Sequence, residues 1–112
     1  MLATFAAFEA EVWRQSEPTG QDLLCLGGLG IAGEAGEVAD AIKKHIFHTR
    51  PLDRDALLKE VGDVLWYAMA VCRAVDASLE DAADAVAAKL RLRYPNGFNA
   101  DDAARRADER VI

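Results

Sequence analysis

The chain has 112 residues, which is enough for one domain with a modest core. Hydrophobic residues make up 52% and charged residues 29%, as in soluble globular domains, and the abundance of alanine over β-branched residues favours helices. The net charge of −6 argues against a nucleic-acid duplex or an anionic membrane as partner, because both attract a basic surface.

The first half of the chain predicts two helices. The first spans about residues 3–15 and ends at the turn-forming sequence SEPTGQD. The second runs from about residue 22 to residue 45, with Asp22 as the expected N-cap. The sequence HTRPLD follows as a loop, because Pro51 disfavours a helical conformation in the residue before it.

The second predicted helix contains GLGIAG at residues 28–33, which matches the glycine pattern of a dinucleotide-binding turn. That turn follows a strand in a βαβ unit, and no stretch here shows the alternation of a strand. The glycines lie inside a helical pattern, so they predict close approach of a second helix. Each interior glycine costs about 1 kcal/mol relative to alanine, which packing or a ligand should offset.

The second half of the chain predicts three more helices. One spans about residues 54–75 with Asp53 as its cap, and its sequence EVGDVLWYAMAVC is apolar almost all round, as in a central core helix. The next starts at SLED and continues to about Arg93 before Pro95. PNGFN forms a turn, and Asn99 caps a short last helix. The expected fold is all-α: a single domain over residues 1–112 with four main helices and a short C-terminal helix, completed by oligomerisation.

The start of the chain, MLATFAAFEAEVW, has early acidic residues and lacks the basic region of a signal peptide. No apolar run approaches the roughly 20 residues that a membrane span needs. Cys25 and Cys72 lie in apolar helical contexts and are expected to be buried free thiols in a reducing compartment. A cytoplasmic protein is therefore expected.

Two pairs of acidic residues carry the main chemical signal. Glu34 and Glu37 form E-x-x-E on the second helix, and Glu60 and Asp63 form E-x-x-D on the third. A spacing of three residues puts each pair on one helix face, and antiparallel neighbouring helices would bring the four carboxylates together. Crowded carboxylates among apolar residues repel one another, and a hard cation offsets the repulsion. The pattern predicts a Mg²⁺ site, with Mn²⁺ as the alternative ion; the competing interpretation is ordinary surface carboxylates.

Three segments in order, GIAGEAGEVADAIKK, LLKEVGDVLWY and KLRLRYPNGF, resemble the MazG-type members of the all-α nucleoside triphosphate pyrophosphohydrolase superfamily. The resemblance covers about residues 22–99. It implies a helical bundle that assembles as a homodimer or homotetramer. It also implies hydrolysis of a nucleoside triphosphate to a monophosphate and pyrophosphate by cleavage between the α- and β-phosphates. The implied Mg²⁺ ligands are Glu34, Glu37, Glu60 and Asp63.

Catalysis of this reaction requires a group that accepts a proton from the attacking water. Among the four carboxylates, Glu37 or Glu34 is the expected catalytic residue. The resemblance further implies substrate contacts by Lys89, Arg93 and Tyr94. Lys89 and Arg93 share a helix face and could both reach a phosphate; the alternative is that they are solvated cations that complement the helix dipole.

One position departs from the family pattern. Many members carry asparagine three residues before the lysine, and that asparagine contacts the nucleotide. Val86 stands there in this chain and donates no hydrogen bond from its side chain, so no relative's base or sugar preference is carried over.

Aromatic and histidine side chains offer weaker signals. Trp13, Phe47 and Trp66 are candidates for base stacking, although core or interface packing is the more common role of such residues. His45 and His48 flank a loop beside the acidic helix and suggest zinc, but their spacing is not that of the H-E-x-x-H motif.

The sequence thus predicts Mg²⁺-dependent hydrolysis of a nucleoside or deoxynucleoside triphosphate, serving to clean the nucleotide pool. One alternative is a phosphoribosyl-ATP pyrophosphohydrolase, which shares the reaction. The other is a catalytically silent helical assembly or regulatory protein, against which the four intact acidic positions weigh. Neither a nucleic acid nor a membrane is an expected partner.

Overall fold

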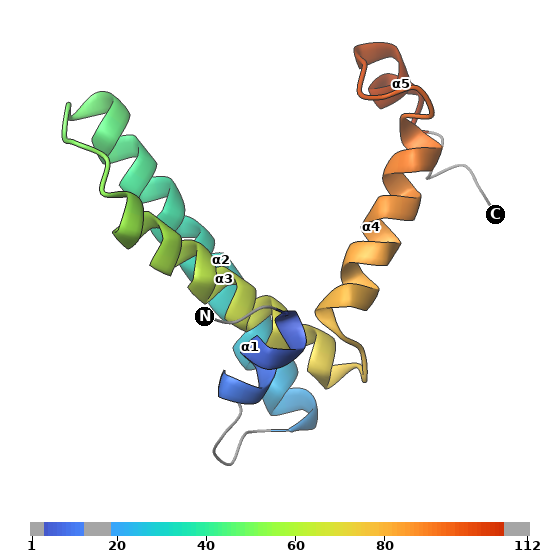
Figure 1. The fold of residues 1–112 in the computed structure, drawn as a ribbon, viewed down its shortest axis with the longest axis horizontal. Helices are drawn as coiled ribbons and strands as arrows, with labels where there is room; N and C mark the ends of the chain where they lie inside the picture. Colours follow the sequence, from blue (N-terminus) through green and yellow to red (C-terminus); the bar gives the residue numbers. More distant parts are fainter. Residues whose placement is uncertain (1–3, 13–18, 107–112) are drawn as a thin grey trace. The chain divides into compact units, whose positions relative to one another are not determined.

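The computed structural model describes residues 4–12 and 19–106, which form five α-helices and no strand (Figure 1). The helices are α1 (Phe5–Val12), α2 (Gly20–Phe47), α3 (Arg54–Ala74), α4 (Leu79–Arg93) and α5 (Ala100–Arg105). The all-α prediction is confirmed. Two compact units form, one with α1, α2 and α3 and ending at Ser78, the other with α4 and α5 and beginning at Leu79.

The start of α2 differs from the prediction. The helix begins at Gly20 after Thr19, which is extended with a φ of −132°, so Asp22 is not its N-cap. Gly20 has a φ of 58°, a left-handed conformation that glycine adopts without a steric cost. Asp22 instead lies in the first turn, where its negative charge complements the helix dipole.

The predicted caps of α3 and α5 are confirmed. The Asp53 carboxylate accepts a hydrogen bond from the Ala56 N–H at 3.0 Å, and the Asn99 side-chain oxygen accepts one from the Asp102 N–H at 2.8 Å. The turn after α4 also forms as expected, with the Gly97 N–H donating to the Tyr94 carbonyl at 3.2 Å. These local polar patterns therefore fix where helices begin.

Helices α2 and α3 run side by side in opposite directions (Figure 1). Two glycines of α2 allow the close approach. A Cβ atom at Gly30 would lie 2.2–2.4 Å from three ring atoms of Tyr67, and one at Gly27 would lie 2.7 Å from the Val71 Cγ2 atom. The predicted packing role of the glycines is confirmed at Gly30, and Gly27 adds a second contact that the sequence pattern did not single out.

The other two glycines of GLGIAG do not share this role, because a Cβ at Gly28 or Gly33 would meet no atom within 4 Å. They provide a matched test. Gly30→Ala should be less stable than Gly33→Ala by about 1–3 kcal/mol, the usual cost of overpacking, since both gain the same helix propensity. The Tyr67 ring cannot swing away without changing its χ1 angle, because its Cγ atom is among those met. Equal stability of the two variants in urea denaturation would contradict this packing.

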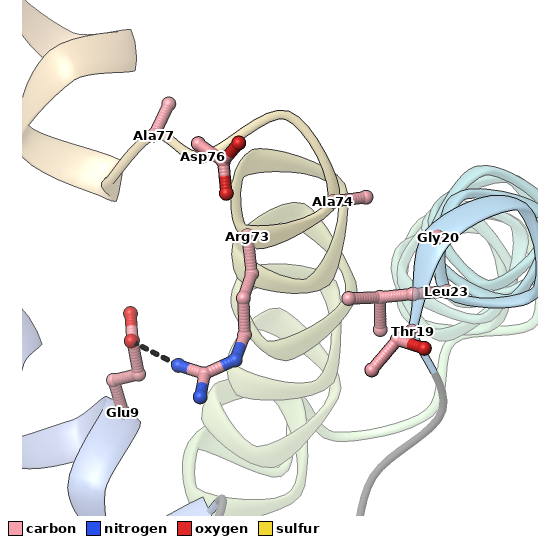
Figure 2. A pocket seen from close by; sticks show the side chains of 8 residues that line it. All are labelled: Glu9, Thr19, Gly20, Leu23, Arg73, Ala74, Asp76 and Ala77. Carbon is pink, nitrogen blue, oxygen red and sulfur yellow. Dashed lines mark hydrogen bonds and ion pairs between the residues drawn. The ribbon is translucent and has the colours of Figure 1, made fainter.

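An ion pair joins α1 to the last turn of α3. The Arg73 guanidinium lies 2.5 Å from the Glu9 carboxylate, beside an open cavity of about 590 Å³ (Figure 2). The C-terminal half of α3 is well buried, with Met69 and Ala70 at 1% and 0% exposure. The prediction that α3 is central to the core therefore holds for this half, whereas Leu58 in its first half is 51% exposed.

The prediction that both cysteines are buried is wrong for Cys25 and only partly met by Cys72. Cys25 is exposed on α2, and Cys72 is half-buried on α3. None of the helices in the described part of the chain has the length and apolar character required to cross a membrane.

Candidate metal centre

Three carboxylates from two helices converge where α2 and α3 pack. One oxygen atom each from Glu34, Glu60 and Asp63 lies within 4.8 Å of the other two. Glu34 follows Gly30 by about one helical turn, so the close approach of the backbones at Gly30 carries the α2 carboxylate toward α3. Small residues inside α2 thus position the acidic side chains.

Glu37, the fourth predicted ligand, does not join this group of three oxygens. It is exposed on α2, and three residues fall about 60° short of a full turn after Glu34. Its negative charge still contributes to a raised pKa of Glu34. Glu37 therefore lies at the edge of the acidic centre, in a different environment from the other three carboxylates.

The pKa of Glu34 is raised above its ordinary value. Partial burial is the largest cause, followed by the negative charge of Asp63, a hydrogen bond with Glu60 and the charges of Glu60 and Glu37. A carboxylate whose charged form is disfavoured by neighbouring anions would be stabilised by a nearby cation. The centre therefore has the electrostatic character of a cation site.

The donor set suits a hard divalent ion. An octahedral ion with ligands at about 2.1 Å spaces their oxygens roughly 3–4.2 Å apart. The separations among Glu34, Glu60 and Asp63, all within 4.8 Å, approach this spacing, so small side-chain rotations suffice. Carboxylate oxygens are the ligands that Mg²⁺ and Mn²⁺ prefer.

The raised pKa of Glu34 predicts a specific dependence of stability on pH. The folded state binds this proton more tightly than the unfolded chain, so the contribution of Glu34 to stability falls as pH rises through the raised pKa. In the presence of a chelator, Glu34→Gln should be more stable than the parent at neutral pH. The difference should shrink as pH falls toward the ordinary glutamate value of about 4.3. Thermal unfolding at several pH values checks this, and a constant difference across that window would contradict it.

The predicted substrate residues belong to the unit that begins at Leu79. Lys89 is exposed on α4, Arg93 is half-buried one turn later, and Tyr94 is half-buried directly after the helix. The acidic residues and these three residues therefore lie in different units. Val86, 46% exposed, precedes Lys89 on α4, at the position where the family resemblance led us to expect asparagine.

Sequence reasoning missed Phe98. Its ring packs against Tyr94 with centroids 5.0 Å apart, and Phe98 remains 79% exposed. Both residues line an apolar cavity of the second unit, whose other lining residues include Leu90 and Arg91. The available signal was the pair of aromatic residues on either side of the PNG turn, of which only Tyr94 was predicted to be a site residue.

Within the described residues, the structure does not bring the other aromatic and histidine candidates together in one site. Trp66 makes an edge contact with Tyr67 at a centroid distance of 4.4 Å, and Phe47 is 76% exposed at the end of α2. Trp13 lies outside the described residues. The Nδ1 atom of His45 lies 2.7 Å from the Arg50 carbonyl oxygen and is therefore engaged by the loop after α2.

Residues 28–98, which include the acidic centre, Lys89, Arg93 and Tyr94, match the MazG nucleotide pyrophosphohydrolase domain. The Gene 37 protein of Mycobacterium phage L5 is 33% identical over 73 residues, which cover 62% of this chain. The match spans 64% of the length of that relative. No solved structure matches significantly. The family match extends over more than half of the chain, which therefore belongs to the MazG nucleotide pyrophosphohydrolase domain family.

Proposed function

We propose that this protein hydrolyses a nucleoside or deoxynucleoside triphosphate to the monophosphate and pyrophosphate in a Mg²⁺-dependent reaction. The family supports nucleotide pyrophosphohydrolase activity in general. The observation that carries the finer proposal is the convergence of Glu34, Glu60 and Asp63 on one point between two helices. A catalytically silent relative would have no need to keep these repelling carboxylates together.

Glu34, Glu60 and Asp63 would hold the divalent ion. A bound ion of this kind neutralises phosphate charge and favours in-line attack by water. Because neighbouring anions and partial burial raise the pKa of Glu34, a bound cation would relieve the repulsion among these carboxylates. The three side chains would thus hold the ion at the α2–α3 contact, where it could orient the substrate phosphates.

Glu37 is the proposed proton acceptor. Its carboxylate lies outside the group of three ligand oxygens yet close enough to act electrostatically on Glu34. An exposed carboxylate at the edge of the centre can take a proton from a water molecule and pass it to solvent. The sequence analysis predicted Glu37 or Glu34 for this role. We favour Glu37, because its carboxylate is not among the three converging oxygens.

Lys89, Arg93 and Tyr94 are proposed to bind the substrate. The two cations lie one turn apart on α4 and offer charge-assisted hydrogen bonds to phosphate oxygens. Tyr94 has its ring against Phe98, which limits its motion and leaves its hydroxyl for a substrate oxygen. The Val86 side chain donates no hydrogen bond, so we propose that other residues recognise the base or sugar.

A turnover assay tests this function. The protein is incubated with ribo- and deoxyribonucleoside triphosphates and with phosphoribosyl-ATP, each with Mg²⁺ or with a chelator. We expect pyrophosphate release that requires Mg²⁺ and that is highest for a nucleoside triphosphate. Turnover of phosphoribosyl-ATP alone would assign the protein to histidine biosynthesis. Absence of turnover with every compound would support the silent helical assembly.

A homodimer or homotetramer is proposed as the working form. Apolar residues at spacings of three, four and seven follow one line along α2, here called the α2 stripe: Leu24, Gly28, Ile31, Ala35, Ile42 and Ile46. Leu24, Ile42 and Ile46 are 37%, 40% and 59% exposed, and Gly28 faces open space. Such a charge-free heptad line suits packing against a second helix, with the small residues allowing close approach.

A charge in the α2 stripe should weaken assembly. Ile42→Lys places an ammonium group in the centre of the apolar line, whereas Cys25→Lys adds the same charge on an exposed position beside it. Light scattering at micromolar concentration should show a smaller species for Ile42→Lys and the parent mass for Cys25→Lys. A parent that is monomeric and active at this concentration would contradict the proposed assembly.

A further inference from the structure

A second cavity adjoins the acidic centre. It has a volume of about 210 Å³ and lies between the end of α2, the following loop and the start of α3. Glu60 lines this cavity and also belongs to the group of three converging carboxylates. The apolar part of the lining comes from Ala41, Pro51, Leu52, Ala56 and Leu57.

The loop that closes this cavity is held against α2 by backbone bonds. The Lys44 carbonyl accepts hydrogen bonds from the N–H groups of His48 at 3.2 Å and Arg50 at 3.4 Å. Thr49 between them has a φ of 52°, a left-handed conformation that is uncommon for a β-branched residue. This tight reversal brings the Arg50 carbonyl to the Nδ1 atom of His45 at 2.7 Å.

The hydrogen bond to the Arg50 carbonyl oxygen determines which ring nitrogen of His45 can accept a hydrogen bond from a ligand. A carbonyl oxygen only accepts hydrogen bonds, so the Nδ1 atom carries a hydrogen. In the neutral imidazole, the Nε2 atom is then an acceptor. His45 lines the cavity and so brings to it one fixed tautomer with an acceptor nitrogen.

Two of the other polar groups in the lining already have partners. The Lys44 ammonium lies 2.7 Å from the Asp40 carboxylate, and the Asp53 carboxylate caps α3. Within the described residues, no carboxylate forms an ion pair with Arg50, whose guanidinium offers several donors. The polar groups available to a ligand are thus an imidazole acceptor and a guanidinium, set among apolar walls.

We infer that this cavity is the subsite for the nucleobase of the substrate, an inference that rests on the proposed function. Its volume is below the roughly 300–1,000 Å³ of pockets for drug-sized ligands, which suits one ring system. Apolar walls with a few polar groups match a flat heterocycle. Asp53 and Glu60 lie in the same lining and offset its cations, so a pyrophosphate group would find no net positive site there.

The spacing along α3 supports the same assignment. Ala56 and Leu57 precede Glu60 by about one turn, which is roughly 5.4 Å along the helix. A ribose separates a base from its α-phosphate by a similar step. A nucleotide whose α-phosphate contacts an ion held by Glu60 could therefore place its base in the cavity. This arrangement supplies base contacts that do not depend on the side chain at Val86.

Nucleosides test the subsite directly, because they lack phosphates. Adenosine, guanosine, cytidine and uridine are titrated separately into the ¹⁵N-labelled full chain without Mg²⁺, and pyrophosphate is titrated in a parallel series. We expect at least one nucleoside to shift the amide resonances of residues 41–57, with little change from pyrophosphate. Shifts of these amides by pyrophosphate alone, or by none of the compounds, would overturn the inference.

Filling the cavity provides a second test with a matched control. Ala41→Leu adds bulk inside the cavity, and Ala39→Leu adds the same bulk at an exposed position outside its lining. Ala41→Leu should lose the nucleoside shifts and raise KM on the order of tenfold, while keeping the Mg²⁺-dependent rise in Tm. Ala39→Leu should match the parent.

The two proposals fail in different ways. If the parent hydrolyses nucleoside triphosphates and Ala41→Leu leaves both KM and nucleoside binding unchanged, the base subsite is wrong and the activity stands. If the parent hydrolyses no triphosphate, the proposed function fails. The nucleoside titration then still decides whether the cavity binds a base.

Discussion

Replacing Glu60 by glutamine or Asp63 by asparagine should reduce turnover by more than about a hundredfold. Loss of an outer-shell partner of a metal site already costs about 10–100-fold, and these residues are proposed to contact the ion directly. Each amide keeps the shape of the carboxylate but removes its negative charge from the group that includes Glu34. Metal affinity and turnover should therefore fall together.

The melting temperature separates this effect from a general loss of structure. Mg²⁺ at about 100 times its Kd should stabilise the parent by roughly 2.7 kcal/mol, because the ion binds the folded state. Glu60→Gln and Asp63→Asn should lose most of this gain and should be no less stable than the parent without metal. Asp55→Asn, a change at an exposed position of the same helix, serves as the control. This variant should keep both its activity and its stabilisation by Mg²⁺. Full activity and full stabilisation in Asp63→Asn would identify these carboxylates as ordinary surface charges.

Glu37→Gln should show a different pattern. If Glu37 accepts the proton of the attacking water, its amide should lower kcat by about 10²–10⁴-fold, the usual contribution of a general base. The gain in Tm with Mg²⁺ should be largely retained, because Glu37 lies outside the three converging carboxylates. Glu34→Gln, three residues earlier, should lose both turnover and the rise in Tm with Mg²⁺.

The comparison of Glu37→Gln with Glu60→Gln decides between the two roles that the sequence allowed for Glu37. Equal loss of Mg²⁺-dependent stabilisation in both variants would make Glu37 a metal ligand. Unchanged kcat in Glu37→Gln would exclude it as the proton acceptor. Measuring kcat and Tm on the same samples links the two results.

Local sequence patterns predicted much of this fold. The caps at Asp53 and Asn99 follow from side chains that bond to a backbone N–H three residues later, so neighbours in the sequence suffice. The predicted start of α2 was wrong, because the helix begins at Gly20, in a left-handed conformation, two residues before Asp22. The observed N-cap residue, Thr19, makes no side-chain hydrogen bond to the helix, so no capping pattern in the sequence marked this start.

The acidic centre was predicted in outline and refined by tertiary structure. The three-residue spacing placed Glu34 and Glu37 on one helix face and Glu60 and Asp63 on another. Antiparallel packing of these two helices was enough to predict that the carboxylates converge. The separation of Glu37 from the other three depends on the rotation of α2 against α3. The glycine pattern predicted a close helix contact, but it did not identify Tyr67 as the partner of Gly30 or the resulting orientation of the two helices.

The cavity beside Glu60 was beyond sequence reasoning for a similar reason. Its wall depends on the reversal at Thr49, a β-branched residue that local preferences place outside the left-handed region. His45 drew attention only as a zinc candidate, whereas the structure engages its Nδ1 atom with the Arg50 carbonyl. Hydrogen bonds within residues 44–50, together with the packing of α3 beside α2, shape this site, and residue type alone does not reveal it.

The products formed early in the reaction test the central claim most directly. The parent protein is mixed with a nucleoside triphosphate and Mg²⁺, and ³¹P nuclear magnetic resonance follows the first few per cent of turnover. The account predicts equal amounts of nucleoside monophosphate and pyrophosphate, no early orthophosphate, and no reaction in the Asp63→Asn variant. Early orthophosphate together with a nucleoside diphosphate would mean cleavage between the β- and γ-phosphates and would contradict the proposed function.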